Sequence, residues 1–147
     1  MKQLDHEATA AQGCSFCAII NRKVHTPKIW EDHEFLAFLD CNPVNSGHTL
    51  IIPKRHVEYV FAMEDKLYLR MFKIAKELSN PIKNAMHSKR IGIVVEGFGV
   101  PHAHIHLVPI NKGHELSPSR ARTATKRELE QVAEKIKQQI ERAHVKT

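Results

Sequence analysis

The chain has 147 residues, 42% of them hydrophobic and 26% charged, and its formal net charge is +6. This mixture is typical of one globular domain, and the sequence contains no internal repeat or low-complexity tract. No apolar run approaches the roughly 20 residues that span a bilayer. Residues 1–13 are polar, are expected to be loosely ordered, and lack the apolar stretch of a secretory signal. We therefore expect a cytoplasmic protein with no membrane partner.

The charge and the cysteines argue against two further classes of protein. Much of the positive excess lies after residue 117, on what the pattern predicts to be the exposed face of a helix. No basic patch is interleaved with aromatic residues, so we expect no specific nucleic-acid partner. The three cysteines, Cys14, Cys17 and Cys41, are an odd number, which argues for reduced thiols or metal ligands over a disulfide framework.

The first half of the chain predicts a short helix followed by strands. In residues 14–23 the i, i+3, i+4 spacing of Phe16, Ile19 and Ile20 indicates one buried helical face. Strands are predicted at residues 28–32, 34–40 and 48–53. A turn at Asp32 joins the first two, and the turn-forming residues 41–47 precede the third.

The second half predicts two long helical patterns around two more strands. A helical pattern runs from Asp65 to Ala85, and Pro81 either kinks it or divides it into two helices. Residues 91–97 and 102–110 are predicted strands. A capping box of Thr125 and Glu128 begins the last helix, expected over about 125–145. The fold class is thus α+β, with a mainly antiparallel sheet, a long central helix and a C-terminal helix in one domain over 1–147.

Three histidines alternate with apolar residues in the stretch His-Ala-His-Ile-His-Leu-Val-Pro, residues 102–109. On a strand, His102, His104 and His106 would share one face. An exposed polar face would not require three histidines. Two interpretations remain from the residues alone: a site in which the imidazoles ligate a metal, and a site in which one histidine attacks a phosphate while its neighbours donate hydrogen bonds.

This stretch resembles the signature of the histidine triad (HIT) superfamily. The stretch FLAFLDCNPVNSGHTLIIPKRHV, residues 35–57, is similar to the family segment that leads into a nucleotide-contacting histidine, and CSFCAII resembles the start of its zinc-carrying members. Within the superfamily, the chain most resembles the Hint-like branch. The resemblance covers a core of about residues 14–112. It implies an α+β fold and a homodimer in which the sheets of two subunits join. It also implies hydrolysis or transfer of purine nucleoside phosphoramidates or dinucleoside polyphosphates.

The resemblance implies a role for each matching residue. His104 would be the nucleophile that forms a nucleotidyl-histidine, with a nearby backbone carbonyl, that of His102, fixing its tautomer. His106 and His48 would stabilise charge on the phosphate, so that no catalytic metal is required. Asp40 would accept hydrogen bonds from the ribose hydroxyls. The base would lie between Phe16, Ile19 and Phe38.

The zinc-carrying members also imply a metal site. One C-x2-C pair, Cys14 and Cys17, is only half of a zinc site. The resemblance supplies His56 and His102 as the other ligands. These four residues would form a closed structural Cys2His2 site and leave His104 and His106 free.

The chain departs from the family pattern beside the triad, which keeps alternatives open. Many members have Gly-Gln and a Ser or Thr before the triad, where this chain has Phe98 to Pro101, and their asparagine on the preceding strand is missing. Glu96 is a candidate substitute proton donor. The alternatives are a nucleotide-binding or interaction module with little turnover, and a metal-dependent hydrolase with the triad histidines as ligands.

Overall fold

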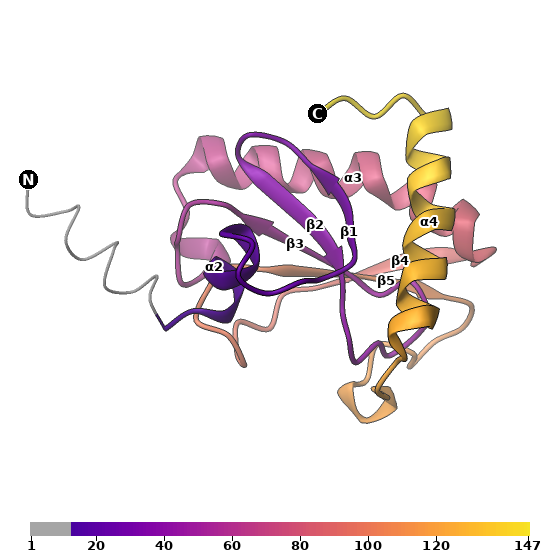
Figure 1. Ribbon diagram of the computed structural model, residues 1–147. Helices are drawn as coiled ribbons and strands as arrows, with labels where there is room; N and C mark the ends of the chain where they lie inside the picture. The colour runs from indigo at the N-terminus through magenta and orange to yellow at the C-terminus, as the bar shows by residue number, and fades with distance from the viewer. Residues whose placement is uncertain (1–12) are drawn as a thin grey trace, which may run out of the picture.

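The computed structural model describes residues 13–147 as a five-stranded sheet with helices on both of its faces (Figure 1). This architecture confirms the predicted α+β class. The strands are β1 (Lys28–Glu31), β2 (Phe35–Leu39), β3 (Thr49–Pro53), β4 (Arg90–Val94) and β5 (Ile105–Ile110). The helices are α2 (Ser15–Ile20), α3 (Asp65–Met86) and α4 (Lys126–Arg142), with short 3₁₀ turns at Val60–Ala62 and Pro118–Arg120. The expectation of a loosely ordered N-terminus lies on residues outside the described range.

The sheet is antiparallel throughout, in the order β1-β2-β3-β5-β4. The chain crosses from β3 to β4 through α3 and then returns to insert β5 between them. The register places Phe38 opposite Leu50, Leu50 opposite His106, and His106 opposite Val94. Because partners opposite each other share a face, these residues form one row across four strands.

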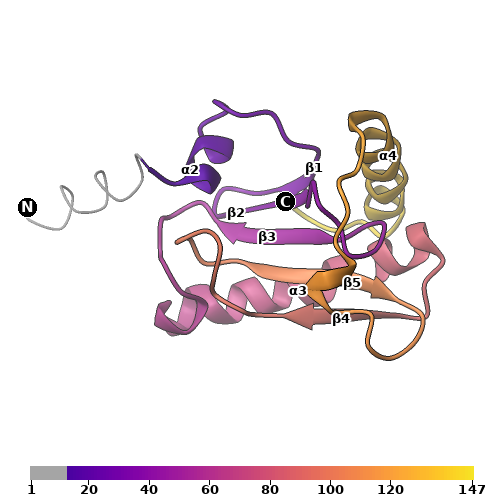
Figure 2. The ribbon, with the colours of Figure 1, turned by 90° about the horizontal axis from the view of Figure 1, so that it is seen from below.

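The two faces of the sheet have different coverings (Figure 2). On one face, Ala37, Ile51 and Ile105 belong to the main core with α3 and α4. On the other face, Phe38, Leu50 and other side chains form a smaller cluster with Phe16 and Cys17 of α2. Since α2 is only six residues long, it packs on Phe38 and Leu50 but covers only part of this second face.

The two long helices form where the sequence pattern predicts them. α3 continues through the buried Pro81 as one helix of 22 residues, which decides between the two predicted alternatives. The capping box of Thr125 and Glu128 at the start of α4 is confirmed, with both of its hydrogen bonds present. None of the helices in residues 13–147 is both long enough and apolar enough to cross a membrane.

Two predicted strand boundaries are wrong. β5 begins at Ile105, so that only His106 of the three histidines lies on a strand. The backbone before it is held by loops instead, because the N–H of Ala103 donates to the carbonyl of Val57 and that of His102 to Val100. β4 ends at Val94, so that Glu96 lies in the loop that follows.

Candidate functional site

A cavity of about 810 Å³ opens on the face of the sheet that carries α2. His104 and His106 line it at the triad, Phe16 and Ile19 come from α2, and Phe38 comes from β2. Asp40 lies at the edge of the same cavity. The volume falls within the roughly 300–1,000 Å³ of ligand pockets.

The backbone fixes the protonated nitrogen of His104. Its Nδ1 lies 2.7 Å from the carbonyl oxygen of His102. A carbonyl only accepts, so Nδ1 carries the proton and donates it. In the neutral ring Nε2 therefore keeps its lone pair. The ring is 5% exposed and packs edge-on against Phe16, with ring centroids 5.2 Å apart. His104 is thus an oriented imidazole with one nitrogen free for nucleophilic attack.

A chain of hydrogen bonds leads from the backbone through His48 to His106. The N–H of Val44 donates to Nδ1 of His48 at 3.2 Å, so the proton of a neutral His48 lies on Nε2. That Nε2 is 2.9 Å from Nδ1 of His106 and donates to it. The proton of a neutral His106 then lies on its own Nε2, which makes this ring a hydrogen-bond donor at the cavity.

Burial keeps both of these rings neutral. Burial, together with the neighbouring His48 and His104, lowers the pKa of His106 from its ordinary 6.5 to about 4. Burial also lowers the pKa of His48, although the Asp40 carboxylate acts in the opposite direction. At pH 7 the chain of hydrogen bonds is therefore made of neutral imidazoles with defined tautomers.

The loop from Asp40 to His48 brings these two residues together. The backbone N–H of Asp40 donates to the carbonyl of His48, and Oδ2 of Asp40 lies 3.7 Å from Nε2 of His48. The other carboxylate oxygen accepts the N–H of Asn42 at 2.8 Å. Gly47 closes the turn with φ of +89°, and a Cβ there would lie 2.6 Å from Met86. Only glycine fits this position without strain, and the turn that it forms delivers His48 to the site.

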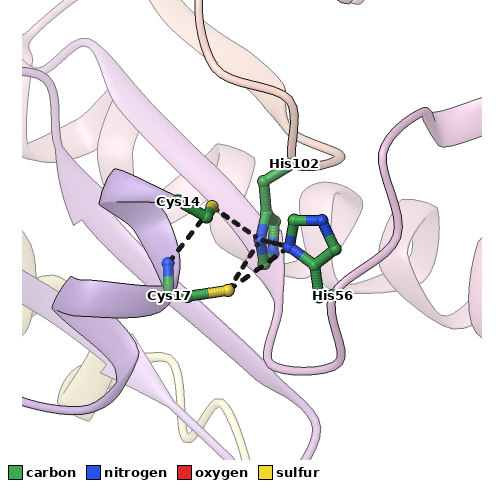
Figure 3. Close-up of side chains that lie close together, drawn as sticks. All are labelled: Cys14, Cys17, His56 and His102. Carbon is green, nitrogen blue, oxygen red and sulfur yellow. Dashed lines mark hydrogen bonds between the residues drawn. The ribbon is translucent and has the colours of Figure 1, made fainter. Parts of the chain in front are cut away.

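A second cluster lies where α2 meets the triad loop (Figure 3), and its His102 packs edge-on against Phe16. Nδ1 of His102 is 3.4 Å from Sγ of Cys14, 3.5 Å from Sγ of Cys17 and 3.2 Å from Nδ1 of His56. All four ligating atoms lie within 4.8 Å of one another. Tetrahedral zinc with bonds of about 2.0–2.3 Å separates its ligand atoms by about 3.3–3.8 Å. The cluster therefore has the donor set and the dimensions of a Cys2His2 zinc site.

The surroundings of this cluster fit a metal as well. Nε2 of the fully buried His102 donates to the carbonyl of Pro53 at 2.7 Å, which leaves the lone pair of Nδ1 directed at the cysteines. Burial and the neighbouring Cys14 together raise the pKa of the Cys17 thiol to about 11. A cation between the sulfur atoms would reverse this effect and favour the thiolates.

The three triad histidines do not converge on one point. Within residues 13–147, the clusters of donor atoms close enough to share an ion are this Cys2His2 group and a group of Asp40, His48 and His106. Neither cluster contains all three triad histidines. In the second cluster Nδ1 of His48 already accepts the Val44 N–H, so its Nε2 must carry a proton and has no lone pair for a metal.

The predicted nucleotide residues gather at the cavity, with one difference. Phe16, Ile19, Phe38, Asp40, His104 and His106 all line it. His48 instead lines a smaller cavity beside Asp40 and touches His106. The sequence reasoning did not identify the contribution of α4, whose Lys126, Leu129 and Glu130 form part of the cavity wall. A capped amphipathic helix carries no local signal for such a role.

Comparison with known proteins gives the family. The HIT domain matches residues 21–113. An uncharacterized HIT-like protein of Borreliella burgdorferi is 42% identical over 103 residues, which cover 65% of this chain and 74% of that protein. The adenylylsulfatase HINT3 of Arabidopsis thaliana is 33% identical over 107 residues, 69% of this chain and 54% of that protein.

Two solved structures extend the likeness over most of the chain. A hypothetical histidine triad nucleotide-binding protein from Sulfolobus tokodaii has a TM-score of 0.79 and 31% identity, covering 88% of this chain and 93% of its own. A zinc-bound histidine triad family protein from Mycobacterium smegmatis has a TM-score of 0.80 and 26% identity, covering 91% and 97%. The chain belongs to the HIT family, whose members bind nucleotides and include hydrolases.

Proposed function

We propose that this protein transfers or hydrolyses the nucleotidyl group of purine nucleoside phosphoramidates or dinucleoside polyphosphates through a covalent intermediate on His104. The observation that carries the proposal is the hydrogen bond from Nδ1 of His104 to the carbonyl of His102. In the neutral ring this bond leaves the lone pair on Nε2, and the ring lines a nucleotide-sized cavity. The likeness to HINT3, whose name describes an adenylylsulfatase, supports nucleotidyl chemistry of this kind.

In the first step, Nε2 of His104 attacks the α-phosphorus and the bond from phosphorus to the leaving group breaks. The leaving group takes the electron pair of that bond and a proton from solvent. In the second step, water adds to the phosphorus and releases a proton to solvent, and Nε2 regains its electron pair as the nucleoside monophosphate departs. Splitting one displacement into two easier ones is the benefit of covalent catalysis.

The other residues bind and orient the substrate in this proposal. The Nε2–H of His106 donates to a phosphate oxygen, and His48 keeps that proton in place through the chain of hydrogen bonds described above. The free oxygen of Asp40 accepts the ribose hydroxyls. Phe16, Ile19 and Phe38 hold the base.

We further propose that Cys14, Cys17, His56 and His102 bind structural zinc. The donor distances and the second bond of His102 to Pro53 support this assignment. When bound, the ion supplies a cross-link between α2 and the triad loop, and none of the chemical steps is assigned to it. The likeness to a zinc-bound family member supports the same site.

The proposal includes a homodimer. β4 is an outer strand of the sheet, and its Ile93 is 46% exposed. A second copy that pairs along β4 would extend the sheet and cover this side chain. The homodimers implied by the family resemblance support such an arrangement.

The test of the enzymatic proposal is intact mass spectrometry after mixing the protein with adenosine 5′-phosphoramidate and quenching in mild base. The wild type is expected to carry an AMP adduct or to release AMP steadily, and His104→Ala to lose both by a factor of at least about 10³. A chelator should leave turnover intact. Nucleotide binding with no adduct and no AMP would instead favour a binding module, an alternative supported by the absence of Gln and Ser from residues 98–101.

A further inference from the structure

Phe98 is the most solvent-exposed of the large hydrophobic side chains in residues 13–147, with 79% of its surface accessible. It lines the same cavity as His104 and His106. A single exposed hydrophobic residue on a protein surface needs no explanation. An exposed aromatic ring at the mouth of a pocket that holds an oriented nucleophile calls for one, because aromatic rings at binding sites provide large contact areas.

The loop around Phe98 is anchored on both sides. Gly97 lies against the ring of Tyr59, so close that a Cβ would lie 3.0 Å from it. Val100 packs on the cluster that includes Phe16, and its carbonyl accepts the N–H of His102 at 2.8 Å. The loop that carries the exposed Phe98 is therefore anchored on one side at Gly97 and on the other at Val100.

The backbone conformation on either side of Phe98 requires glycine. Gly97 has φ of +82° and Gly99 has φ of +87°, both in the region that side chains with a Cβ rarely adopt. This Gly-Phe-Gly arrangement leaves the ring largely exposed while it lines the cavity.

The parts of a nucleotide substrate are already assigned to other residues. In the proposed function, Phe16 and Phe38 hold the base, Asp40 holds the ribose, and His104 attacks the phosphate. The group without a binding residue is the leaving group. Phe98 and Glu96 lie on the loop that leads directly into the triad and line the cavity beside it. The ring is thus available to the group that leaves from the α-phosphate.

We propose that Phe98 is a specificity-determining residue that stacks on a flat ring in the leaving group, either the base of a second nucleoside or an aryl group. The proposal rests on the proposed nucleotidyl chemistry. Stacking of two aromatic rings and the accompanying burial favour flat rings over saturated groups of equal size. We expect this preference to amount to about ten-fold in kcat/KM.

The test compares four AMP derivatives: adenosine 5′-phosphoramidate, its N-benzyl and N-cyclohexylmethyl derivatives, and diadenosine triphosphate. Four proteins are assayed: wild type, Phe98→Ala, Phe98→Tyr and Phe61→Ala. Phe61 is the matched control, an exposed phenylalanine that does not line the cavity. The measured quantity is kcat/KM for each protein relative to wild type on the same substrate.

We expect Phe98→Ala to stay within about two-fold of wild type on the unsubstituted phosphoramidate and the cyclohexylmethyl derivative. We expect it to lose about ten-fold on at least one flat-ring substrate. Phe98→Tyr should keep the activity, and Phe61→Ala should behave as wild type. A loss on the benzyl derivative alone identifies aryl amines, and a loss on diadenosine triphosphate alone identifies a second base. Equal losses on all four substrates, or no loss on either ring substrate, would overturn the proposal. A wild type that turns over none of the four would overturn the enzymatic proposal instead.

Discussion

Nε2 of His48 lies 2.9 Å from Nδ1 of His106, and this contact determines which nitrogen of His106 carries its proton. The direction of the bond comes from the backbone, because the N–H of Val44 occupies the other nitrogen of His48. His48 is therefore a positioning residue in the proposed chemistry. Its effect on the substrate passes through His106.

Replacement of His48 tests this role. In His48→Gln the side-chain amide N–H₂ can still donate to Nδ1 of His106, whereas His48→Leu has no donor. We expect kcat/KM of the glutamine variant to be about ten-fold higher than that of the leucine variant, because only the glutamine keeps the buried hydrogen bond to His106. The measurement is turnover of adenosine 5′-phosphoramidate. Equal activity of the two variants would show that the hydrogen bond to His106 does not contribute to turnover.

The depressed pKa of His106 predicts a dependence of stability on pH. The folded ring binds a proton only near pH 4, while the unfolded one does so near 6.5. The contribution is therefore complete above pH 6.5 and is lost as the pH falls toward 4. Solvent screens the partly exposed ring. We therefore expect His106 to account for a loss of about 1–2 kcal/mol in the free energy of unfolding between pH 7.5 and 5.

The check is urea unfolding of wild type and His106→Asn at both pH values. The difference between the two proteins cancels effects that they share, such as loss of a metal in acid. The variant should lose less stability on acidification. Parallel losses would contradict the low pKa of His106.

Asp40 is expected to recognise the ribose. Asp40→Asn replaces a charged acceptor with a neutral amide and should lower kcat/KM about ten- to a hundred-fold for ribonucleotide substrates. A 2′,3′-dideoxy substrate has no hydroxyl to donate and should react equally poorly with both proteins. The measurement is the ratio of kcat/KM for the ribonucleotide substrate to kcat/KM for the dideoxy substrate, in wild type and in Asp40→Asn. A similar loss on both would assign Asp40 to support of His48, 3.7 Å away, instead.

The zinc proposal predicts that two of the three cysteines matter. Cys17→Ser should abolish stoichiometric zinc in elemental analysis of the purified protein and lower the stability by about 3 kcal/mol, or roughly 6–12 °C in Tm. Cys41→Ser is the matched control, since Cys41 is exposed and lies outside the cluster. Loss of zinc from both variants, or from neither, would contradict the assignment.

The dimer proposal is tested at Ile93. A lysine there places a charge on the strand edge that a second copy would cover, and Ile93→Lys should convert a dimer to a monomer. Size-exclusion chromatography with light scattering gives the mass directly, with 16.8 kDa expected for one chain. Ile93→Val keeps the apolar edge and should remain dimeric. A wild type that elutes as a monomer would contradict the proposal.

The sequence predicted the elements of the fold better than their ends. Thr125 and Glu128 are a local signal, and the helix that they begin is confirmed. The strand that was expected to start at His102 starts at Ile105, because the preceding backbone bonds to Val57 in a distant loop. Alternation along a chain does not contain that information.

The same limit applies to the candidate site. The family resemblance predicted four zinc ligands, and the structure brings them together: Cys14, Cys17, His56 and His102. It did not predict that His48 would touch His106 while lining a different cavity, nor that α4 would supply Lys126 to the pocket wall. These relations depend on packing between elements that are far apart in the sequence.

The pairing of β3 with β5 has a consequence for how the protein folds. It brings together His48 and His106, which are 58 positions apart in the chain. Closing a loop of that length costs roughly 3–4 kcal/mol in chain entropy, before any contact repays it. A nascent or partly unfolded chain therefore has its histidines dispersed in solvent, and the oriented imidazoles exist only after the long-range strands have joined.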